Sequence, residues 1–266
     1  MGFHVESSWT IGAWDEVKQM VTDTSAQNEQ IMIARIMLAM REGQTEAISE
    51  ALSAARSVLG TPIVAAGIGG YRRCYDSVMQ LHSVHELEQI HQTMTQLSGS
   101  QSRRRTALAP LSKILSRRLD STLPTFRIRE GVLSMRRTAF ALRYELFFFL
   151  FTAVIGALTI FSSVNAASQE IGRSWLASAK IARKAGQWQT AYSAILQAKH
   201  RDTPNSFMEN AKLLNATGES LRALQELENS MRLLGMIDSA DVDVDLTHED
   251  DATFTATKAK VCQSSK

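Results

Sequence analysis

Apolar residues recur at three- and four-residue steps along two long stretches of this chain. Steps of this kind are typical of amphipathic helices, in which one apolar face packs against the rest of the protein. Glycine interrupts the pattern at Gly12 and Gly43, and again at Gly186 and Gly218, with nearly the same separation in both pairs. Helices broken by glycine at so regular a spacing predict a series of helical hairpins.

The spacing is close to that of tetratricopeptide-like repeats, in which small residues let paired helices approach closely. Gly12-Ala13-Trp14 and Gly186-Gln187-Trp188 share a Gly-x-Trp turn, which favours a repeat. A single hairpin cannot bury its apolar face alone, so we expect neighbouring hairpins to stack into a solenoid. An ordinary helical bundle with coincidental glycine spacing is the alternative. Either architecture is all-α, which agrees with only 4 prolines among 266 residues.

The chain divides into five segments by pattern and charge. Residues 1–100 and 168–237 are predicted to form two helical-repeat blocks, separated by an irregular basic connector over 101–145 and an apolar insert over 146–167. Residues 238–266 are predicted to be a disordered acidic tail, because Asp238 to Asp251 holds seven acidic residues in fourteen and few bulky apolar ones.

Local signals predict where individual helices begin and end. Gly60-Thr61-Pro62 is expected to end a helix, and Leu123-Pro124-Thr125 is expected to be a turn. Ser206-Phe-Met-Glu209 has the form of a capping box. Glu228 and Arg232 lie four residues apart and are expected to form an ion pair on a wet helix face.

The connector is the most basic part of the chain. Residues 101–143 contain eleven Lys and Arg residues against two acidic ones, Asp120 and Glu130. Such a stretch can attract phosphate backbones, but Phe126 and Phe140 are isolated and supply no interleaved aromatic surface for base stacking. We therefore favour a solvated face, or a partner for acidic surface elsewhere in the protein, over direct contact with nucleic acid.

The run from Leu146 to Val164 contains no charged residue. Its length suits a transmembrane helix, preceded by the basic residues Arg136, Arg137 and Arg143. A buried core helix is a second interpretation. A third is that residues from about Leu142 to Ala167 are a translated intron, because pyrimidine-rich noncoding DNA read as codons yields Phe, Leu and Ser; the residues from Lys258 to Lys266 could likewise come from a misread junction.

No residue is assigned a catalytic, cofactor-binding or metal-binding role. Gly67-Ile68-Gly69-Gly70 lacks the Lys and Ser or Thr that complete a phosphate-binding loop. His82, His85 and His91 with Glu86 resemble a metal set, but the spacing fails the metalloprotease pattern. Two cysteines, Cys74 and Cys262, cannot form a zinc site alone. We expect this chain to have no active site and no cofactor of its own.

One segment carries a family resemblance. The sequence from Trp175 to Tyr192, WLASAKIARKAGQWQTAY, closely resembles a repeat in the FAT domain of ATR-type checkpoint kinases. Upstream segments look like the same region of fungal members: Pro62 to Gly67, Tyr71 to Asp76, Leu81 to Glu88, Arg118 to Arg127 and Ser134 to Arg137. The similarity covers most of residues 5–143 and 170–237, and stops across the apolar run.

The resemblance implies a nuclear serine/threonine protein kinase of the phosphatidylinositol-kinase-related class, which acts in the DNA-damage and replication checkpoint. In that family the FAT domain is a helical solenoid that clasps the kinase domain and contributes to a homodimer, and a partner subunit recruits the enzyme. ATP and Mg²⁺ bind in the kinase domain, which this chain does not include, so the chain alone is expected to be inactive. The alternative is a membrane-anchored tetratricopeptide-like adaptor without a kinase connection, anchored by Leu146 to Val164.

Overall fold

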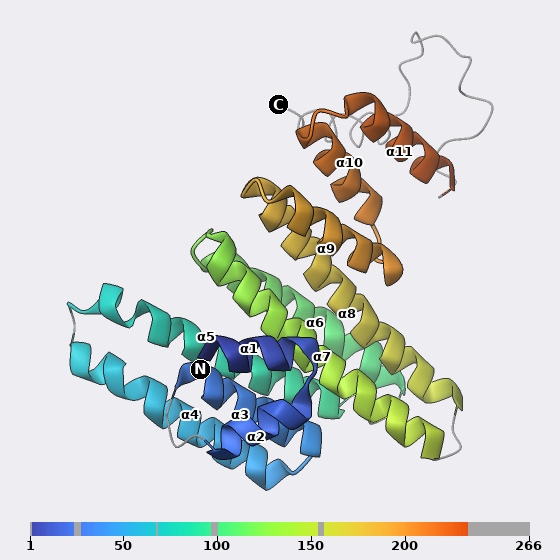
Figure 1. Ribbon diagram of the computed structural model, residues 1–266. Coiled ribbons are helices and arrows are strands. Elements are labelled where there is room, and N and C mark those ends of the chain that lie inside the picture. The colour runs from blue at the N-terminus through green and yellow to red at the C-terminus, as the bar shows by residue number, and fades with distance from the viewer. Residues whose placement is uncertain (1, 24–27, 68, 97–100, 154–156, 234–266) are drawn as a thin grey trace, which may run out of the picture. The chain divides into compact units, whose positions relative to one another are not determined.

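The computed structural model describes residues 2–23, 28–67, 69–96, 101–153 and 157–233, without the side chains of 71, 101–107 and 143–166. All regular secondary structure in these ranges is α-helical (Figure 1). The helices are α1 (Gly2–Ile11), α2 (Trp14–Asp23), α3 (Glu29–Glu42), α4 (Thr45–Ala66), α5 (Tyr71–Gln96), α6 (Gln101–Ser121), α7 (Phe126–Ala153), α8 (Ala157–Lys184), α9 (Trp188–His200), α10 (Ser206–Ala216) and α11 (Ser220–Leu233). The prediction of an all-α helical-repeat protein is confirmed.

The four glycines that predicted the repeat all lie between paired helices. Gly12 separates α1 from α2, Gly43 separates α3 from α4, Gly186 separates α8 from α9, and Gly218 separates α10 from α11. Their φ angles are +88°, +74°, +75° and +93°, a left-handed conformation that residues with a Cβ adopt at a cost. The glycine spacing therefore marks the loops of four helical hairpins, because each loop needs one left-handed residue to end its first helix.

The chain forms two compact units, Met1–Trp175 and Leu176–Lys266. In the first unit α3 is the central helix and contacts α1, α2, α4, α5 and α7. Every residue from Ile31 to Met40 except Arg35 is buried, which is the pattern of a helix surrounded by others. The largest fully buried side chains around α3 are Trp9, Leu87, Ile90, Met94, Phe140 and Leu142.

The second unit has a different kind of core, because most of its buried apolar residues are alanines. These are Ala179, Ala182, Ala191, Ala194, Ala198, Ala211 and Ala223. Ile195 and Leu213 are the larger buried members. Small side chains at helix contacts let the helix axes approach closely, as in the helical repeats that the sequence predicts.

The prediction of an irregular connector over 101–145 is wrong, because this segment contains α6 and the start of α7. Residues 122–125 are the non-helical part, so the turn at Leu123-Pro124-Thr125 is confirmed. Besides its many basic residues, the segment contains an apolar stripe with helical spacing. The stripe consists of four buried leucines at steps of three and four: Leu108, Leu111, Leu115 and Leu119. Both helices belong to the first compact unit.

The helix expected to end at Gly60-Thr61-Pro62 continues to Ala66 and stops at Gly67, whose φ is +63°. Pro62 has no N–H to donate within the helix. The Thr61 hydroxyl donates to the Ser57 carbonyl at 2.9 Å, and the Cys74 thiol of α5 donates to the Pro62 carbonyl at 3.5 Å. Packing of α4 along α5 therefore keeps α4 helical beyond Pro62.

The predicted capping box at Ser206 and Glu209 is also wrong. Asn205 precedes α10 in a left-handed conformation, with φ +66°, and its side chain makes no capping bond. The Glu209 carboxylate instead accepts hydrogen bonds from Arg183 of α8 at 3.2 Å and from Lys212 at 3.1 Å. The ion pair between Glu228 and Arg232 is confirmed at 2.7 Å.

The apolar run from Leu146 to Val164 is distributed over two helices, since α7 ends at Ala153 and α8 begins at Ala157. Within the part of the chain that the structure describes, no helix has the length and apolar character needed to cross a membrane. The side chains of the run lie outside the described residues, as does the predicted acidic tail over 238–266.

Candidate functional site

A buried ion pair lies at the centre of the first unit. Glu86 of α5 is 3% exposed and Arg136 of α7 is 4% exposed. The Arg136 guanidinium donates from Nε and Nη2 to the two carboxylate oxygens of Glu86, both at 2.8 Å, and Nη2 also donates to the Leu115 carbonyl of α6 at 2.9 Å. Because both charges are removed from water, the bidentate hydrogen bond and the third bond to Leu115 are needed to offset the free-energy cost of desolvation. Arg136 thereby joins α5, α6 and α7.

The next residue, Arg137, joins α7 to α8. Its Nη2 donates to Glu130 at 2.6 Å, and its guanidinium carbon lies 3.9 Å from the ring centre of Trp175. Burial lowers the pKa of Arg137, and the neighbouring Glu130 carboxylate opposes that shift. A cation that is both stacked on an indole and bonded to a carboxylate stabilises this helix contact.

Glu170 of α8 completes the polar core. Arg173 donates to Glu170 at 2.5 Å and to the Ser112 hydroxyl of α6 at 3.3 Å. Burial raises the pKa of Glu170, while Arg173, Ser112 and the charge of Arg136 act in the opposite direction. The charged groups of this polar core bond mainly to one another and to neighbouring helices, so the arrangement fixes helix positions rather than presenting a group for reaction.

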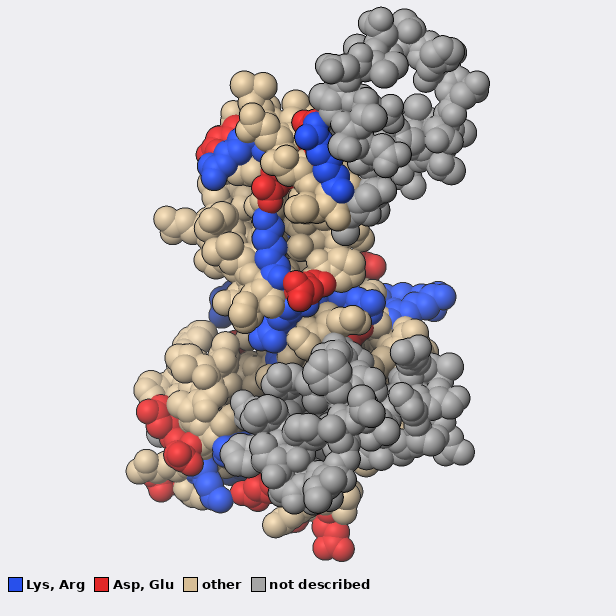
Figure 2. All heavy atoms as spheres, turned by 90° about the vertical axis from the view of Figure 1, so that its right-hand side faces the viewer, with Lys and Arg blue, Asp and Glu red and all other residues tan. Residues whose placement is uncertain are grey.

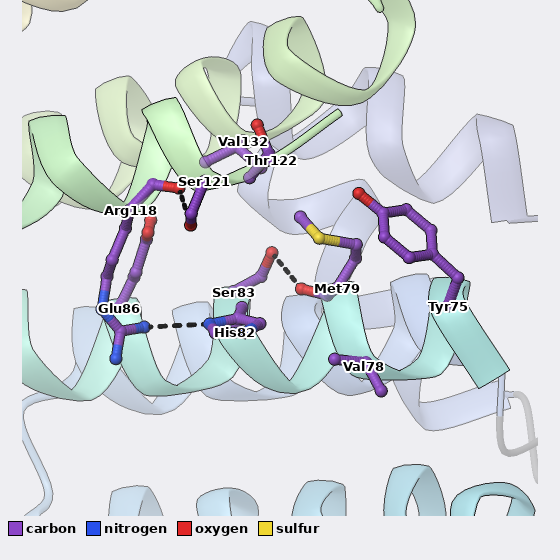
Figure 3. A pocket seen from close by; sticks show the side chains of 10 residues that line it. All are labelled: Tyr75, Val78, Met79, His82, Ser83, Glu86, Arg118, Ser121, Thr122 and Val132. Atoms are coloured by element: carbon purple, nitrogen blue, oxygen red, sulfur yellow. Dashed lines mark hydrogen bonds between the residues drawn. The ribbon is translucent and has the colours of Figure 1, made fainter. Parts of the chain in front are cut away.

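A small pocket of about 60 Å³ borders this core, lined by Tyr75, His82, Glu86 and Arg118 among others (Figure 3). Arg118 and the His82 ring nitrogen Nδ1 lie 3.3 Å apart, and Ser83 donates to the Met79 carbonyl. The volume is far below the ~300 Å³ at which small-molecule sites begin. The pocket has room for a few water molecules beside the polar core.

The structure does not bring together the histidines and Glu86 that resemble a metal set in the sequence. Glu86 is bound to Arg136, His85 lies 3.4 Å from Glu88, and His82 faces Arg118. Among the described residues, no group of three or more His, Cys, Asp or Glu is placed to hold a metal ion.

Several of the connector arginines are turned inward instead of forming a solvated face. Besides Arg136 and Arg137, Arg129 donates to the Thr122 carbonyl at 3.0 Å. The side chains of Arg103, Arg104 and Arg105 lie outside the described residues. The predicted solvated face is therefore wrong for Arg136 and Arg137, because both side chains are buried. The alternative prediction, that the connector pairs with acidic groups of the protein, is confirmed for both.

The buried pair has a signal in the sequence that charge counting overlooks. Ile90 lies four residues after Glu86, while Leu133 and Phe140 lie three before and four after Arg136. Each charged residue therefore sits on the apolar stripe of its helix, where a charge is expected only if it has a buried partner.

In the second unit, ion pairs also connect successive helices. Lys199 of α9 and Asn210 of α10 both donate to Glu226 of α11, at 2.6 Å and 3.0 Å. These bonds lower the pKa of Glu226, with the Lys199 hydrogen bond the largest cause. Figure 2 shows Lys and Arg side chains beside Asp and Glu side chains at several places on one face of the described residues.

The second unit also presents an apolar stripe to solvent on α9. Trp188, Tyr192 and Leu196 follow one another at four-residue steps and are 42%, 53% and 48% exposed. On α11, Leu221 and Leu224 are exposed as well. Aromatic and aliphatic side chains at one helical face are the usual anchors of protein contacts.

Known proteins share the sequence pattern of this chain. A family model described as "FAT domain" matches residues 2–261. Serine/threonine-protein kinase ATR of Arabidopsis thaliana is 28% identical over 251 residues, covering 88% of this chain and 8% of that protein. Serine/threonine-protein kinase ATR of Drosophila melanogaster is 28% identical over 242 residues (86% and 9%), and protein kinase rad3 of Schizosaccharomyces pombe is 23% identical over 228 residues (85% and 8%). The chain thus spans less than a tenth of the length of these relatives. No solved structure matches the chain.

Proposed function

The chain belongs to the FAT domain family, and on that premise we propose that it is a scaffold segment of an ATR-type serine/threonine protein kinase. Its role is to pack against the kinase domain of the same polypeptide and hold it in position. The proposed enzyme acts in the nucleus, in the response to DNA damage and stalled replication. ATP and Mg²⁺ would bind in the kinase domain, and a partner subunit and a second copy of the enzyme complete the proposed assembly.

The exposed stripe of α9 carries this proposal. Trp188, Tyr192 and Leu196 leave about half of their surface in water although they lie on one helical face. Fully burying a side chain of this size stabilises a contact by about 1.5–3 kcal/mol. Covering three half-exposed side chains with a partner surface would therefore stabilise the docked complex substantially. The buried polar core supports the same role, because a scaffold must keep its helices in fixed positions.

The test is made in the gene that encodes this segment, so that the whole polypeptide is present. Trp188→Ala, Tyr192→Ala and Leu196→Ala are combined, and the kinase is immunoprecipitated and assayed on a serine-containing peptide. We expect activity to fall by about tenfold or more, the equivalent of losing roughly one such burial, at an unchanged protein level.

Ser193→Ala combined with Gln197→Ala is the matched control, since both side chains are exposed on the same helix but neither belongs to the apolar stripe. The control is expected to keep full activity. Full activity in the stripe variant, or an equal loss in both, would refute the proposed docking.

A further inference from the structure

A second and much larger cavity opens within the first unit, where α1, α3, α5 and α7 meet. Its volume is about 860 Å³, which lies within the range of ligand sites. The apolar part of its lining includes Trp9, Ile33, Met79, Ile128, Val132 and Met135. These residues come from four helices that are far apart in sequence.

The charges that line this cavity are unbalanced. Glu6, Glu29 and Asp76 contribute three carboxylates, whereas Arg127 is the one Lys or Arg among the described residues of the lining. Glu6 and Glu29 are half-buried and Asp76 is exposed. No ion pair neutralises these three carboxylates in the described part of the chain, whereas Glu86, Glu130 and Glu170 of the same unit each have one. Burial, and then repulsion by Asp76, raise the pKa of Glu29. The cavity therefore has a deficit of positive charge.

Polar atoms of the same lining residues lack hydrogen-bond partners. They are Trp9 Nε1, Gln30 Oε1 and Gln80 Oε1, each buried and unbonded among the described residues. Trp9 is 2% exposed, so bulk water does not reach its N–H. The indole needs an acceptor and the two amide oxygens need donors. Leaving buried polar groups unpaired is costly, so an occupant that supplies both kinds of group would be favoured.

We propose that this cavity is the docking site for a basic, apolar peptide segment of a partner protein. An Arg or Lys side chain of that segment lies between Glu29 and Asp76 and donates to the carboxylates. On binding, the side chains of Trp9, Gln30 and Gln80 turn toward the segment, so that the Trp9 N–H donates to one of its backbone carbonyls and the glutamine oxygens accept from its donors. The apolar side chains of the segment cover Ile33 and Met79. This surface is in the first unit, whereas the α9 stripe is in the second, so its existence does not depend on the proposed contact with a kinase domain.

The proposal is tested by fluorescence anisotropy with the full 266-residue chain. The probe is a fluorescein-labelled dodecapeptide that alternates leucine with arginine, and the comparison peptide has glutamate in place of arginine. We expect the arginine peptide to bind and the glutamate peptide to fail. Glu29→Gln combined with Asp76→Asn is expected to weaken binding by about tenfold or more, because two charge-assisted hydrogen bonds are lost.

Glu46→Gln combined with Glu50→Gln is the matched control, because it removes the same number of charges from exposed positions on α4. This control separates docking in the cavity from general attraction of a cationic peptide. Trp9→Phe keeps an aromatic ring and removes the N–H, so we expect a several-fold loss with an unchanged circular dichroism spectrum. Equal weakening by both charge pairs, binding of both peptides alike, or self-association of the chain in place of peptide binding would each overturn the proposal.

Discussion

The guanidinium carbon of Arg137 lies 3.9 Å from the ring centre of Trp175, although the two residues are far apart in the sequence. A single straight helix running from one to the other would separate them by about 57 Å, at roughly 1.5 Å per residue. The contact therefore requires α7, which ends at Ala153, and α8, which begins at Ala157, to lie alongside each other. The uncharged run belongs to a helical hairpin and not to one continuous rod.

The stacked pair should contribute measurably to stability. In a double-mutant cycle with Arg137→Met and Trp175→Leu, we expect a coupling energy of about 1–2 kcal/mol, because the cation is largely desolvated. Arg41 and Trp14, at 5.7 Å, are the matched pair and should couple by less than about half as much. Urea unfolding followed by circular dichroism provides the four free energies for each cycle. Equal coupling in the two pairs would contradict this ranking.

Loss of the buried arginine should be far more damaging than loss of an exposed one. Arg136→Met strands the Glu86 carboxylate in the core and is expected to lower the free energy of unfolding by about 3–5 kcal/mol. Arg232→Met breaks the exposed pair with Glu228 and should cost less than about 0.5 kcal/mol. Adding Glu86→Leu to Arg136→Met should recover much of the loss, since no unpaired charge remains. Denaturant titrations of all three variants check the prediction, which fails if the two single substitutions cost the same.

Stability should depend on pH through Glu29. Burial and Asp76 raise its pKa above the ordinary 4.5, so the folded protein holds this proton more tightly than the unfolded chain does. The contribution of Glu29 to stability is therefore greatest at low pH and declines as the pH rises from 4.5 through the folded-state pKa. Glu29→Gln should be more stable than the parent chain at neutral pH, and the difference should vanish well below pH 4.5.

Glu46 provides the control for that experiment, because it occupies the first turn of α4 as Glu29 occupies the first turn of α3. Glu46→Gln removes a favourable interaction with the helix dipole and should cost about 0.3–1 kcal/mol at neutral pH. The two substitutions should thus have opposite signs. A destabilising Glu29→Gln at neutral pH would show that its carboxylate is well accommodated.

Two glycines should respond in opposite ways to alanine. Gly186 has φ +75° with nothing within 4 Å of an added Cβ, so Gly186→Ala isolates the backbone cost of the hairpin loop, about 1–2 kcal/mol. Gly60 lies inside α4, also with open space around it, and Gly60→Ala should stabilise the protein by about 0.5–1 kcal/mol. Thermal unfolding of the two variants checks both signs. Were Gly60 the end of its helix, as its sequence context predicts, no such gain would be seen.

The hairpins could be predicted from sequence because their signals are local. A left-handed loop residue and a three- to four-residue apolar step depend on neighbours within a few positions, and the predicted helix breaks at Gly43 and Gly186 are confirmed. The predicted end of α4 at Gly60 is wrong because the packing of α4 on α5, including the bond from Cys74 to the Pro62 carbonyl, outweighs the local preference of Gly60 and Pro62.

The polar core and the large cavity could not be predicted in the same way. Arg136 and Arg137 look like any other basic dipeptide until Glu86 and Trp175, which lie on other helices, are known to face them. The cavity depends on Glu6, Glu29, Asp76 and Arg127 meeting from four helices. Charge counting predicts a solvated face for Arg136 and Arg137 because it contains no information on which helices are neighbours.

The alanine core of the second unit bears on how such a protein can change over time. Where helices touch through small side chains, only small residues fit at every third or fourth position, as at Ala191, Ala194 and Ala198. The packing itself does not restrict the residue type at the positions between them. Substitutions can therefore accumulate on the outward faces without moving the helices. The same contacts have no spare space, so a larger residue at an inward position must push two helices apart. The alanine core thus limits the size of the residue at a few inward sites and sets no limit of its own on the outward faces.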